Sequence, residues 1–267
     1  MAALALTAVS AVATGCLGEP RHRETREVSV EHVTGSPLHV HTRNGSIDIA
    51  THDGADVRIV AKLSSNDKAR LEEAHIVTER GLESELLVDI EWPASWCNHD
   101  AGSFEILVPD ARGVRADASN GSIRVAGLAG RLEPDTHNGA LRITNPDGPV
   151  AADTSNSAII IDGVSGAVEA DTSNGRVEVA LTEANAGPVE LETSNGRVSL
   201  TIGSAFTGTV SARISNGGMT FGPFDERYDV RFGDMGKNEG EAVFGSSPTP
   251  VSTLKTSNGR ITVKNRR

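Results

Sequence analysis

The chain has 267 residues, a formal net charge of −11 and 37% hydrophobic residues. A nucleic-acid-binding surface needs Lys and Arg to displace counterions from phosphates, so the acidic balance argues against a nucleic-acid partner. Aromatic residues are only 3% of the chain and glycines number 28, so the core must be built from Val, Ile, Leu, Ala and Thr. This composition predicts a thin interior.

The first residues read "MAALALTAVSAVATGCLGEP" and predict a signal peptide over residues 1–15. The apolar run is too short to span a bilayer. Its end, "ATGC", resembles the bacterial lipobox, in which the cysteine after the cleavage site carries the lipid. The resemblance implies that Cys16 is the lipid attachment site, that residues 16–27 are a polar tether, and that the protein is anchored in the cell envelope, facing the periplasm or the exterior. A simple cleaved signal or a frayed N-terminus is the alternative.

One short motif recurs along the rest of the chain. It is clearest as "DTSNGRVEV" at 171, "ETSNGRVSL" at 192 and "KTSNGRITV" at 255. Eight copies align on their asparagines, at Asn44, Asn120, Asn138, Asn156, Asn174, Asn195, Asn216 and Asn258. From Asn120 onward the spacing is 18, 18, 18, 21, 21 and 42 residues, and the last interval suggests one copy that has lost its motif near residue 237. A period of about 20 residues is typical of a solenoid.

Apolar residues alternate with polar ones on both sides of each asparagine. In the copy around Asn174, Val168, Ala170 and Thr172 precede it and Val177 and Val179 follow it, with Asp, Glu or Arg between them. Such a period of two predicts a half-buried strand on each side. Seven of the asparagines precede glycine, and the Asn-Gly pair predicts a tight reversal with positive φ at both residues.

The repeats predict an all-β fold: a single-chain parallel β-helix or β-solenoid over residues 28–267, with coils of 18–21 residues. Like residues recur at like positions, which favours rungs about 4.8 Å apart and a ladder of asparagine amides from coil to coil. An antiparallel sandwich or propeller is the alternative. The basic end "TVKNRR" is expected to close the open edge of the stack.

Two segments break the repeat. Residues 64–104 predict a short helix near residues 66–75 and two strands around Gly81. The same segment contains the two tryptophans, Trp92 and Trp96, which either pack over the first coils or form a platform for sugars. Residues 222–250 predict an irregular coil.

The outward position three residues before the asparagine is acidic in five consecutive coils. Its residues are Asp117, Asp135, Asp153, Asp171 and Glu192. Stacked carboxylates repel, so we expect Arg176 and Arg197 to pair with them. The alternative is a cation-binding ladder with weak affinity for Ca²⁺, which prefers several hard oxygens. No other cofactor is expected.

Histidines and the second cysteine offer a weaker metal signal. His39 and His41 share one face with His52 downstream, and Cys97 stands next but one to His99, but neither set supplies four zinc ligands. We expect exposed histidines and a half-buried thiol.

Several stretches together resemble one bacterial family. The lipobox, "TRNGSIDI", "ILVPDARGVRADASNGSIRV", the "DTSNG" coils and the closing "LKTSNGRITV" are similar to the adhesin-like family DUF4097, over about residues 28–265. The resemblance implies a β-helix-like fold and no established enzymatic activity. We therefore expect a non-enzymatic envelope lipoprotein, an adhesin or structural surface scaffold, with envelope polysaccharide or a surface protein as partner. A carbohydrate-binding or carbohydrate-cleaving β-helix protein is the first alternative, and an envelope-stress accessory protein is the second.

Overall fold

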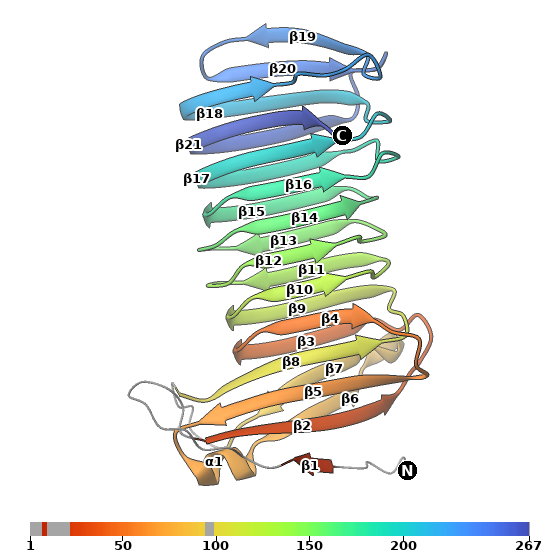
Figure 1. Cartoon of the computed structure of the whole chain (residues 1–267), viewed down its shortest axis with the longest axis vertical. Helices are drawn as coiled ribbons and strands as arrows, with labels where there is room; N and C mark the ends of the chain where they lie inside the picture. Colours follow the sequence, from red (N-terminus) through yellow and green to blue (C-terminus); the bar gives the residue numbers. More distant parts are fainter. Residues whose placement is uncertain (1–6, 10–21, 94–98, 267) are drawn as a thin grey trace.

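The computed structural model describes residues 7–9, 22–93 and 99–266. These residues form twenty-one strands, one α-helix and one short 3₁₀ turn (Leu82–Ser84). The strands stack into a tall, narrow molecule with its N-terminal strands at one end (Figure 1). Cys16, Trp96 and Cys97 lie outside the described residues, and so does most of the predicted signal peptide.

Each asparagine motif joins two strands, which together form one coil. The strands before the asparagine are β3 (Leu38–Asn44), β9 (Gly113–Asn120), β11 (Arg131–Thr136), β13 (Val150–Thr154) and β15 (Val168–Asn174). The strands after it are β4 (Ile47–Thr51), β10 (Ile123–Ala126), β12 (Leu141–Thr144), β14 (Ile159–Val164) and β16 (Val177–Leu181). In β17 (Val189–Ile202), β18 (Gly208–Phe221) and β21 (Val251–Asn265) one strand runs through both arms.

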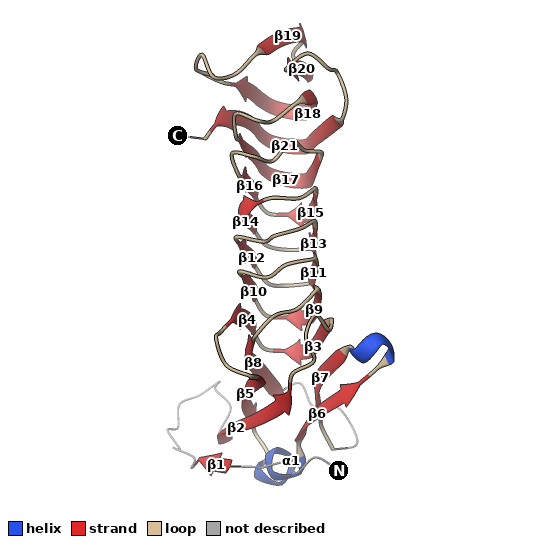
Figure 2. Ribbon diagram, turned by 90° about the vertical axis from the view of Figure 1, so that its right-hand side faces the viewer, coloured by secondary structure: helices blue, strands red, loops and turns tan. Residues whose placement is uncertain are grey.

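Successive coils pair in parallel on both faces of the stack. β9 pairs with β11, β11 with β13 and β13 with β15 on one face, while β10, β12, β14 and β16 pair in the same way on the other. Seen from the side, the two sets form facing strips (Figure 2). We call the side of the first set the first face and that of the second set the second face.

The interior between the faces is filled by the predicted inward residues. In the coil around Asn174, Val168, Ala170, Val177 and Val179 are all buried, and Thr172 is buried at 1% exposure. The buried threonines place their hydroxyls under the turn: Thr172 Oγ1 donates to the carbonyl oxygen of Ser157 in the coil below, at 3.1 Å. A polar side chain can therefore lie in this thin core because the neighbouring coil accepts its hydrogen bond.

The asparagines form the expected ladder along the edge of the stack. From Asn120 onward each side-chain amide donates to the amide oxygen of the neighbouring asparagine, for example Asn174 to Asn156 at 3.1 Å and Asn195 to Asn174 at 3.0 Å, while Asn44, at the end of the ladder, donates to the backbone oxygen of Asp100. The ladder links all eight motif asparagines, in the spatial order Asn44, Asn120, Asn138, Asn156, Asn174, Asn195, Asn258 and Asn216.

The expected positive φ of the Asn-Gly pairs is wrong. Among the motif residues only Gly45 and Gly217 have a φ in the left-handed region, and none of the asparagines does. The glycine is needed for a different reason. A Cβ at Gly196 would lie 1.8 Å from the carbonyl oxygen of Gly175 in the coil below, and the other motif glycines meet the same obstacle. Close stacking, rather than a tight reversal, selects glycine here.

The N-terminal end of the stack is partly antiparallel. β2 (His22–Glu31) pairs antiparallel with β5 (Asp56–Ser65), which pairs antiparallel with β8 (Ala101–Val108), and β8 joins β4 in parallel. On the first face β6 (His75–Arg80) and β7 (Leu86–Glu91) form an antiparallel pair that joins β3. The short strand β1 (Thr7–Val9) pairs with β2. Residues 22–27, which the sequence predicts as tether, are therefore strand.

The predicted helix is present beside this end. It is α1 (Lys68–Glu73), and the side chain of Asp67 caps it by accepting a hydrogen bond from the backbone N–H of Ala69 at 2.9 Å. Arg70 of α1 pairs with the buried carboxylate of Asp100 at 2.5 Å, which fixes the helix to the end of the stack. Trp92 is half-buried against the core, as the packing interpretation expects.

The C-terminal end does not follow chain order. β21 lies between β17 and β18 and pairs with both in parallel, so the last coil of the sequence is an internal rung. The hairpin of β19 (Val230–Met235) and β20 (Glu239–Phe244) instead caps the stack, with β20 antiparallel to β18 (Figure 1). The expected lost copy near residue 237 and the expected closing role of "TVKNRR" are therefore both wrong. The fold is all-β and mostly parallel, as predicted, but mixed rather than wholly parallel.

Candidate binding face: the acidic column

The five acidic residues predicted to stack lie in register on the first face. Asp117 is opposite Asp135, Asp135 opposite Asp153, Asp153 opposite Asp171, and Asp171 opposite Glu192, on neighbouring strands from β9 to β17. We call this set the acidic column. It continues into Lys255 on β21 and Arg213 on β18, so the column changes sign toward the cap.

Within the described residues, basic side chains make hydrogen bonds or ion pairs only with the two ends of the acidic column. Asp117 Oδ2 lies 2.7 Å from His39 Nε2 and accepts a hydrogen bond from Arg115 Nε at 3.0 Å. At the other end Lys255 Nζ lies 3.2 Å from a carboxylate oxygen of Glu192. The sequence missed these partners, because His39 and Lys255 come from strands that are distant along the chain and become adjacent only through the parallel register.

The expected pairing of the column with Arg176 and Arg197 is wrong. Arg176 Nε lies 3.1 Å from Glu178, and both residues belong to the second face. Arg197 lines a depression on the same second face. The two arginines follow the asparagine, so the turn carries them to the opposite side of the stack from the column.

The carboxylates in the middle of the acidic column repel one another. Within the described part of the chain, Asp135, Asp153 and Asp171 make no ion pair. The pKa of Asp135 is raised by burial and then by the charges of Asp153 and Asp117. The pKa of Asp171 is raised in the same way, by burial and then by Asp153 and Glu192. The strand register therefore holds three carboxylates together against an electrostatic cost.

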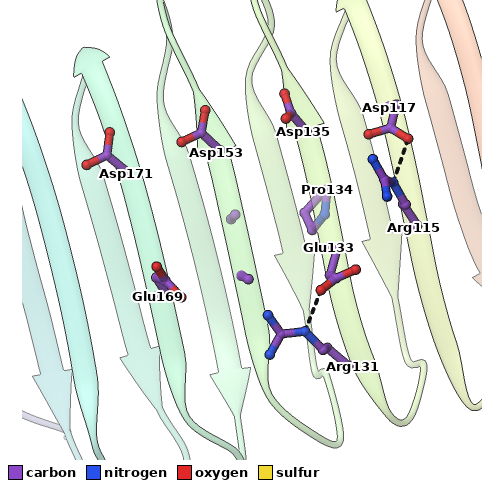
Figure 3. Close-up of a pocket in the computed structure, with 11 residues that line it drawn as sticks. Arg115, Asp117, Arg131, Glu133, Pro134, Asp135, Asp153, Glu169 and Asp171 are labelled. Carbon is purple, nitrogen blue, oxygen red and sulfur yellow. Dashed lines mark hydrogen bonds and ion pairs between the residues drawn. The ribbon is translucent and has the colours of Figure 1, made fainter.

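An open depression of about 380 Å³ lies beside these carboxylates (Figure 3). It exists because Ala151 occupies the position between Glu133 and Glu169 in the adjacent outward column, where its methyl group leaves space. Arg131 at its lower edge pairs with Glu133. The depression presents several equivalent carboxylates, which suits contact with cationic or hydroxyl-bearing groups. Burial and neighbouring carboxylates raise the pKa of Asp135 and that of Asp171 alike, whereas the two catalytic carboxyls of a glycosidase such as lysozyme lie in contrasting environments.

The structure separates the histidines that the sequence places on one face. His39 contacts Asp117, His41 contacts Asp89 at 3.2 Å, and His52 contacts the backbone oxygen of Asp56. Across the described residues, no group of three or more His, Cys, Asp and Glu side chains is arranged to hold a metal ion. Weak Ca²⁺ binding by the acidic column stays a prediction, which calorimetry with and without Asp135→Asn, Asp153→Asn and Asp171→Asn would test.

The second face carries a cationic feature that the sequence pattern did not predict. Arg176, Arg197 and Arg260 each stand two residues after an asparagine, and the insertion of β21 beside β17 places Arg260 directly opposite Arg197. We call these three residues the basic column. The sequence signal for this column is the pentapeptide "TSNGR", which is identical in three copies of the motif. A copy with a different sequence separates the last two of them along the chain.

The described helices include none that is long and apolar enough to cross a membrane. The sequence matches no protein-family model and no curated protein, so membership of DUF4097 stays a prediction.

Several solved structures are similar to the chain. A structure from Clostridium sporogenes, provisionally described as a cell adhesion protein, has a TM-score of 0.35 and 13% identity, over 91% of this chain and 100% of that one. One from Bacteroides fragilis, provisionally described as an adhesin, has a TM-score of 0.42 and 13% identity, over 91% and 97%. One from Parabacteroides distasonis, provisionally described as a lipid-binding protein, has a TM-score of 0.28 and 10% identity, over 94% and 98%. All three TM-scores are below 0.5.

Proposed function

We propose that this chain is a β-solenoid of the cell envelope that acts without catalysis, as an adhesive or structural surface element, and that its acidic column is the binding face. The observation that supports this proposal most directly is the register of the first face. Five coils present a carboxylate at the same position, and the asparagine ladder along the edge fixes their spacing.

Such a face suits an extended partner. Each exposed carboxylate gives a small free energy of interaction on its own, but contacts repeated at a fixed spacing act together once the first has formed. An envelope polysaccharide or a surface protein with repeated cationic or hydroxyl groups fits this description. The open shape of the depression also suits a ligand that lies along the face better than a small molecule that must be enclosed.

The anchoring part of the proposal rests on the sequence "ATGC" and Cys16 alone. Expression of wild type and Cys16→Ala in a bacterial host, followed by fractionation and mass measurement, tests it. Lipidation predicts that wild type is recovered in the membrane with a processed, lipid-bearing mass and that Cys16→Ala is not. Recovery of Cys16→Ala in the membrane at its unprocessed mass would contradict the anchor.

The binding face is tested by capture from envelope fractions. Purified wild type and the triple variant Asp135→Asn, Asp153→Asn, Asp171→Asn are compared with a control triple variant on the second face, Asp48→Asn, Glu105→Gln, Asp162→Asn, which removes the same charge. We expect the first variant to lose its envelope partner and the control to keep it. Equal capture by all three proteins would remove the acidic column as the binding face.

The carbohydrate-cleaving alternative is supported only by the raised pKa of Asp135 and of Asp171. Incubation with isolated envelope polysaccharide distinguishes the two functions. New reducing ends that depend on Asp135 or Asp171 would replace the proposed scaffold by an enzyme.

A further inference from the structure

The basic column on the second face is built from three copies of one pentapeptide. "TSNGR" occurs at 172–176, 193–197 and 256–260, and the copy between the last two along the chain is "ISNGG" at 214–218, with Gly218 in place of arginine. Because β21 inserts between β17 and β18, the three identical copies occupy consecutive rungs and the "ISNGG" copy lies outside them. The arginines are thus adjacent in space although 63 residues separate Arg197 from Arg260.

The three arginines of the basic column are exposed, and only one of them has a carboxylate partner among the described residues. The side chain of Arg176 is 51% exposed and forms an ion pair with Glu178 at 3.1 Å. Arg197 and Arg260 are exposed as well, and within the described part of the chain they make no ion pair with a carboxylate. Like charges directly opposite each other on neighbouring strands are unfavourable, so the column carries a repulsion that an anionic partner would relieve.

The surface beside the basic column is also cationic. A depression of about 340 Å³ is lined by Arg197 together with Arg142 and Lys264. Its carboxylates already have partners, because Glu178 pairs with Arg176 and Asp162 lies 3.9 Å from Arg266. This part of an acidic protein therefore offers unpaired positive charge to a partner.

We propose that the basic column of one copy docks on the acidic column of a second copy of this chain. A second copy fits the acidic column in both charge and spacing. Asp135, Asp153 and Asp171 make no ion pair on three consecutive rungs of the first face, and the three arginines occupy three consecutive rungs of the second face. Both columns repeat at the rung spacing of the same stack, about 4.8 Å, so each arginine of one copy meets one aspartate of the other.

The two columns lie on opposite faces, so the contact is heterologous. Each copy keeps a free acidic column on one side and a free basic column on the other, and copies add side by side in an open row rather than as a closed dimer. Because the arginines lie about two rungs closer to the cap than the aspartates, neighbouring copies are staggered along the stack. This inference rests on the proposed function, because it names the partner of the acidic column.

Charge exchange between the two faces tests the contact. The first variant is Asp135→Lys, Asp153→Lys, Asp171→Lys, and the second is Arg176→Glu, Arg197→Glu, Arg260→Glu, both in the full-length chain. Sedimentation velocity at about 0.15 M salt measures the association of wild type, of each variant alone and of their equimolar mixture. We expect each variant alone to associate at least about tenfold more weakly than wild type. The mixture is expected to recover association, since every contact then joins a lysine or arginine to an aspartate or glutamate.

The design separates the contact from general charge effects. The first variant is less negative than wild type, so association governed by net charge would increase in it, whereas the proposal expects a decrease. Unfolding curves establish that each variant is folded. The neutral set Arg176→Gln, Arg197→Gln, Arg260→Gln gives a second measurement, in which association must also fall if the contact is real.

Two results would overturn the proposal. Wild type that stays monomeric up to about 0.1 mM would do so, and so would folded variants whose mixture associates no better than either alone. Sodium polygalacturonate is a third arm: its binding to a monomeric wild type, and not to the Arg→Glu variant, would assign the basic column to an anionic glycan instead. None of these results affects the capture of an envelope partner by the acidic column, so failure here leaves the proposed function to its own test.

Discussion

At the scale of single residues, the glycine that follows seven of the eight motif asparagines sets how closely the coils can stack. A Cβ would meet the carbonyl oxygen of the coil below at 1.8 Å for Gly121, Gly139, Gly175 and Gly196, far inside van der Waals contact. The asparagine beside it uses the same close approach to reach its neighbour's amide at about 3 Å. The two residues therefore recur together because one permits the short spacing and the other forms a hydrogen bond across it.

Gly196→Ala is expected to destabilise the chain by roughly 1–3 kcal/mol, the range for forcing an extra methyl group into a packed site. Gly218→Ala is the matched control, because a Cβ there meets nothing within 4 Å and its φ lies outside the left-handed region. Denaturant unfolding of both variants measures the difference. Equal stability of the two variants would show that the turn can open, and that stacking does not select glycine.

The acidic column makes a prediction about pH. Burial and neighbouring charge raise the pKa of Asp135 and of Asp171 above the unfolded value of 3.8, so the folded state binds these protons more tightly than the unfolded state. The two ionised carboxylates therefore oppose folding at neutral pH, and their cost disappears as the pH falls through the raised pKa values toward 3.8. Asp135→Asn with Asp171→Asn should be more stable than wild type at pH 7, with a difference that shrinks on acidification.

Asp225 provides a control, because its pKa is shifted in the opposite direction. Hydrogen bonds from the Arg227 side chain and backbone lower the pKa of Asp225 to about 2. The ionised Asp225 carboxylate therefore stabilises the folded state above pH 3.8, and this stabilisation is lost as the pH falls toward 2. Asp225→Asn should be less stable than wild type at pH 7. Thermal unfolding between pH 3 and pH 8 measures both effects. If the double variant Asp135→Asn, Asp171→Asn were less stable than wild type at pH 7, that result would contradict the repulsion within the acidic column.

At the scale of elements, the position of β21 shows what the sequence pattern can and cannot specify. Alternation around each asparagine predicts the two strands of a coil, because burial of one face leaves a period of two in the sequence. It also predicts the acidic column, since equal positions in stacked coils must align. The pattern does not state which coil lies beside which: β21 fits between β17 and β18 with the same inward residues that an end rung would have.

Leu254 tests the internal position of β21. It is fully buried between Leu191 of β17 and Ala212 of β18, whereas an end rung would expose one side of it. Leu254→Ala should therefore cost about 2–5 kcal/mol, the range for a leucine in a closed core. Val251 of the same strand is 56% exposed, and Val251→Ala should change stability by about 0.5 kcal/mol or less. Similar small losses for both variants in denaturant unfolding would place β21 at an edge.

At the scale of the whole molecule, the two ends differ in how they close the stack. The N-terminal end changes to antiparallel pairing through β2, β5 and β8, while the other end is closed by the β19–β20 hairpin. Phe224 packs under this hairpin against Phe244, with ring centroids 5.2 Å apart. The sequence marked residues 64–104 and 222–250 as breaks in the repeat but did not predict the antiparallel pairing at either end, because the pairing partners are set by three-dimensional proximity and not by the repeat. The ion pairs of the acidic column were missed for the same reason.

The order of the rungs predicts where the stack opens first. In a molecule whose coils contact only their neighbours, the end rungs open before the internal ones, so backbone amides near the ends exchange hydrogen fastest. Chain termini ordinarily fray, but β21 is enclosed by two rungs. We expect amides of residues 251–265 to be as protected as those of β17. Amides of β19, which among the described strands pairs with β20 alone, are expected to exchange much faster. Hydrogen exchange followed by mass spectrometry resolves these peptides. Rapid exchange over residues 251–265 together with slow exchange in β19 would contradict the inserted rung and return the last copy of the motif to the end of the stack.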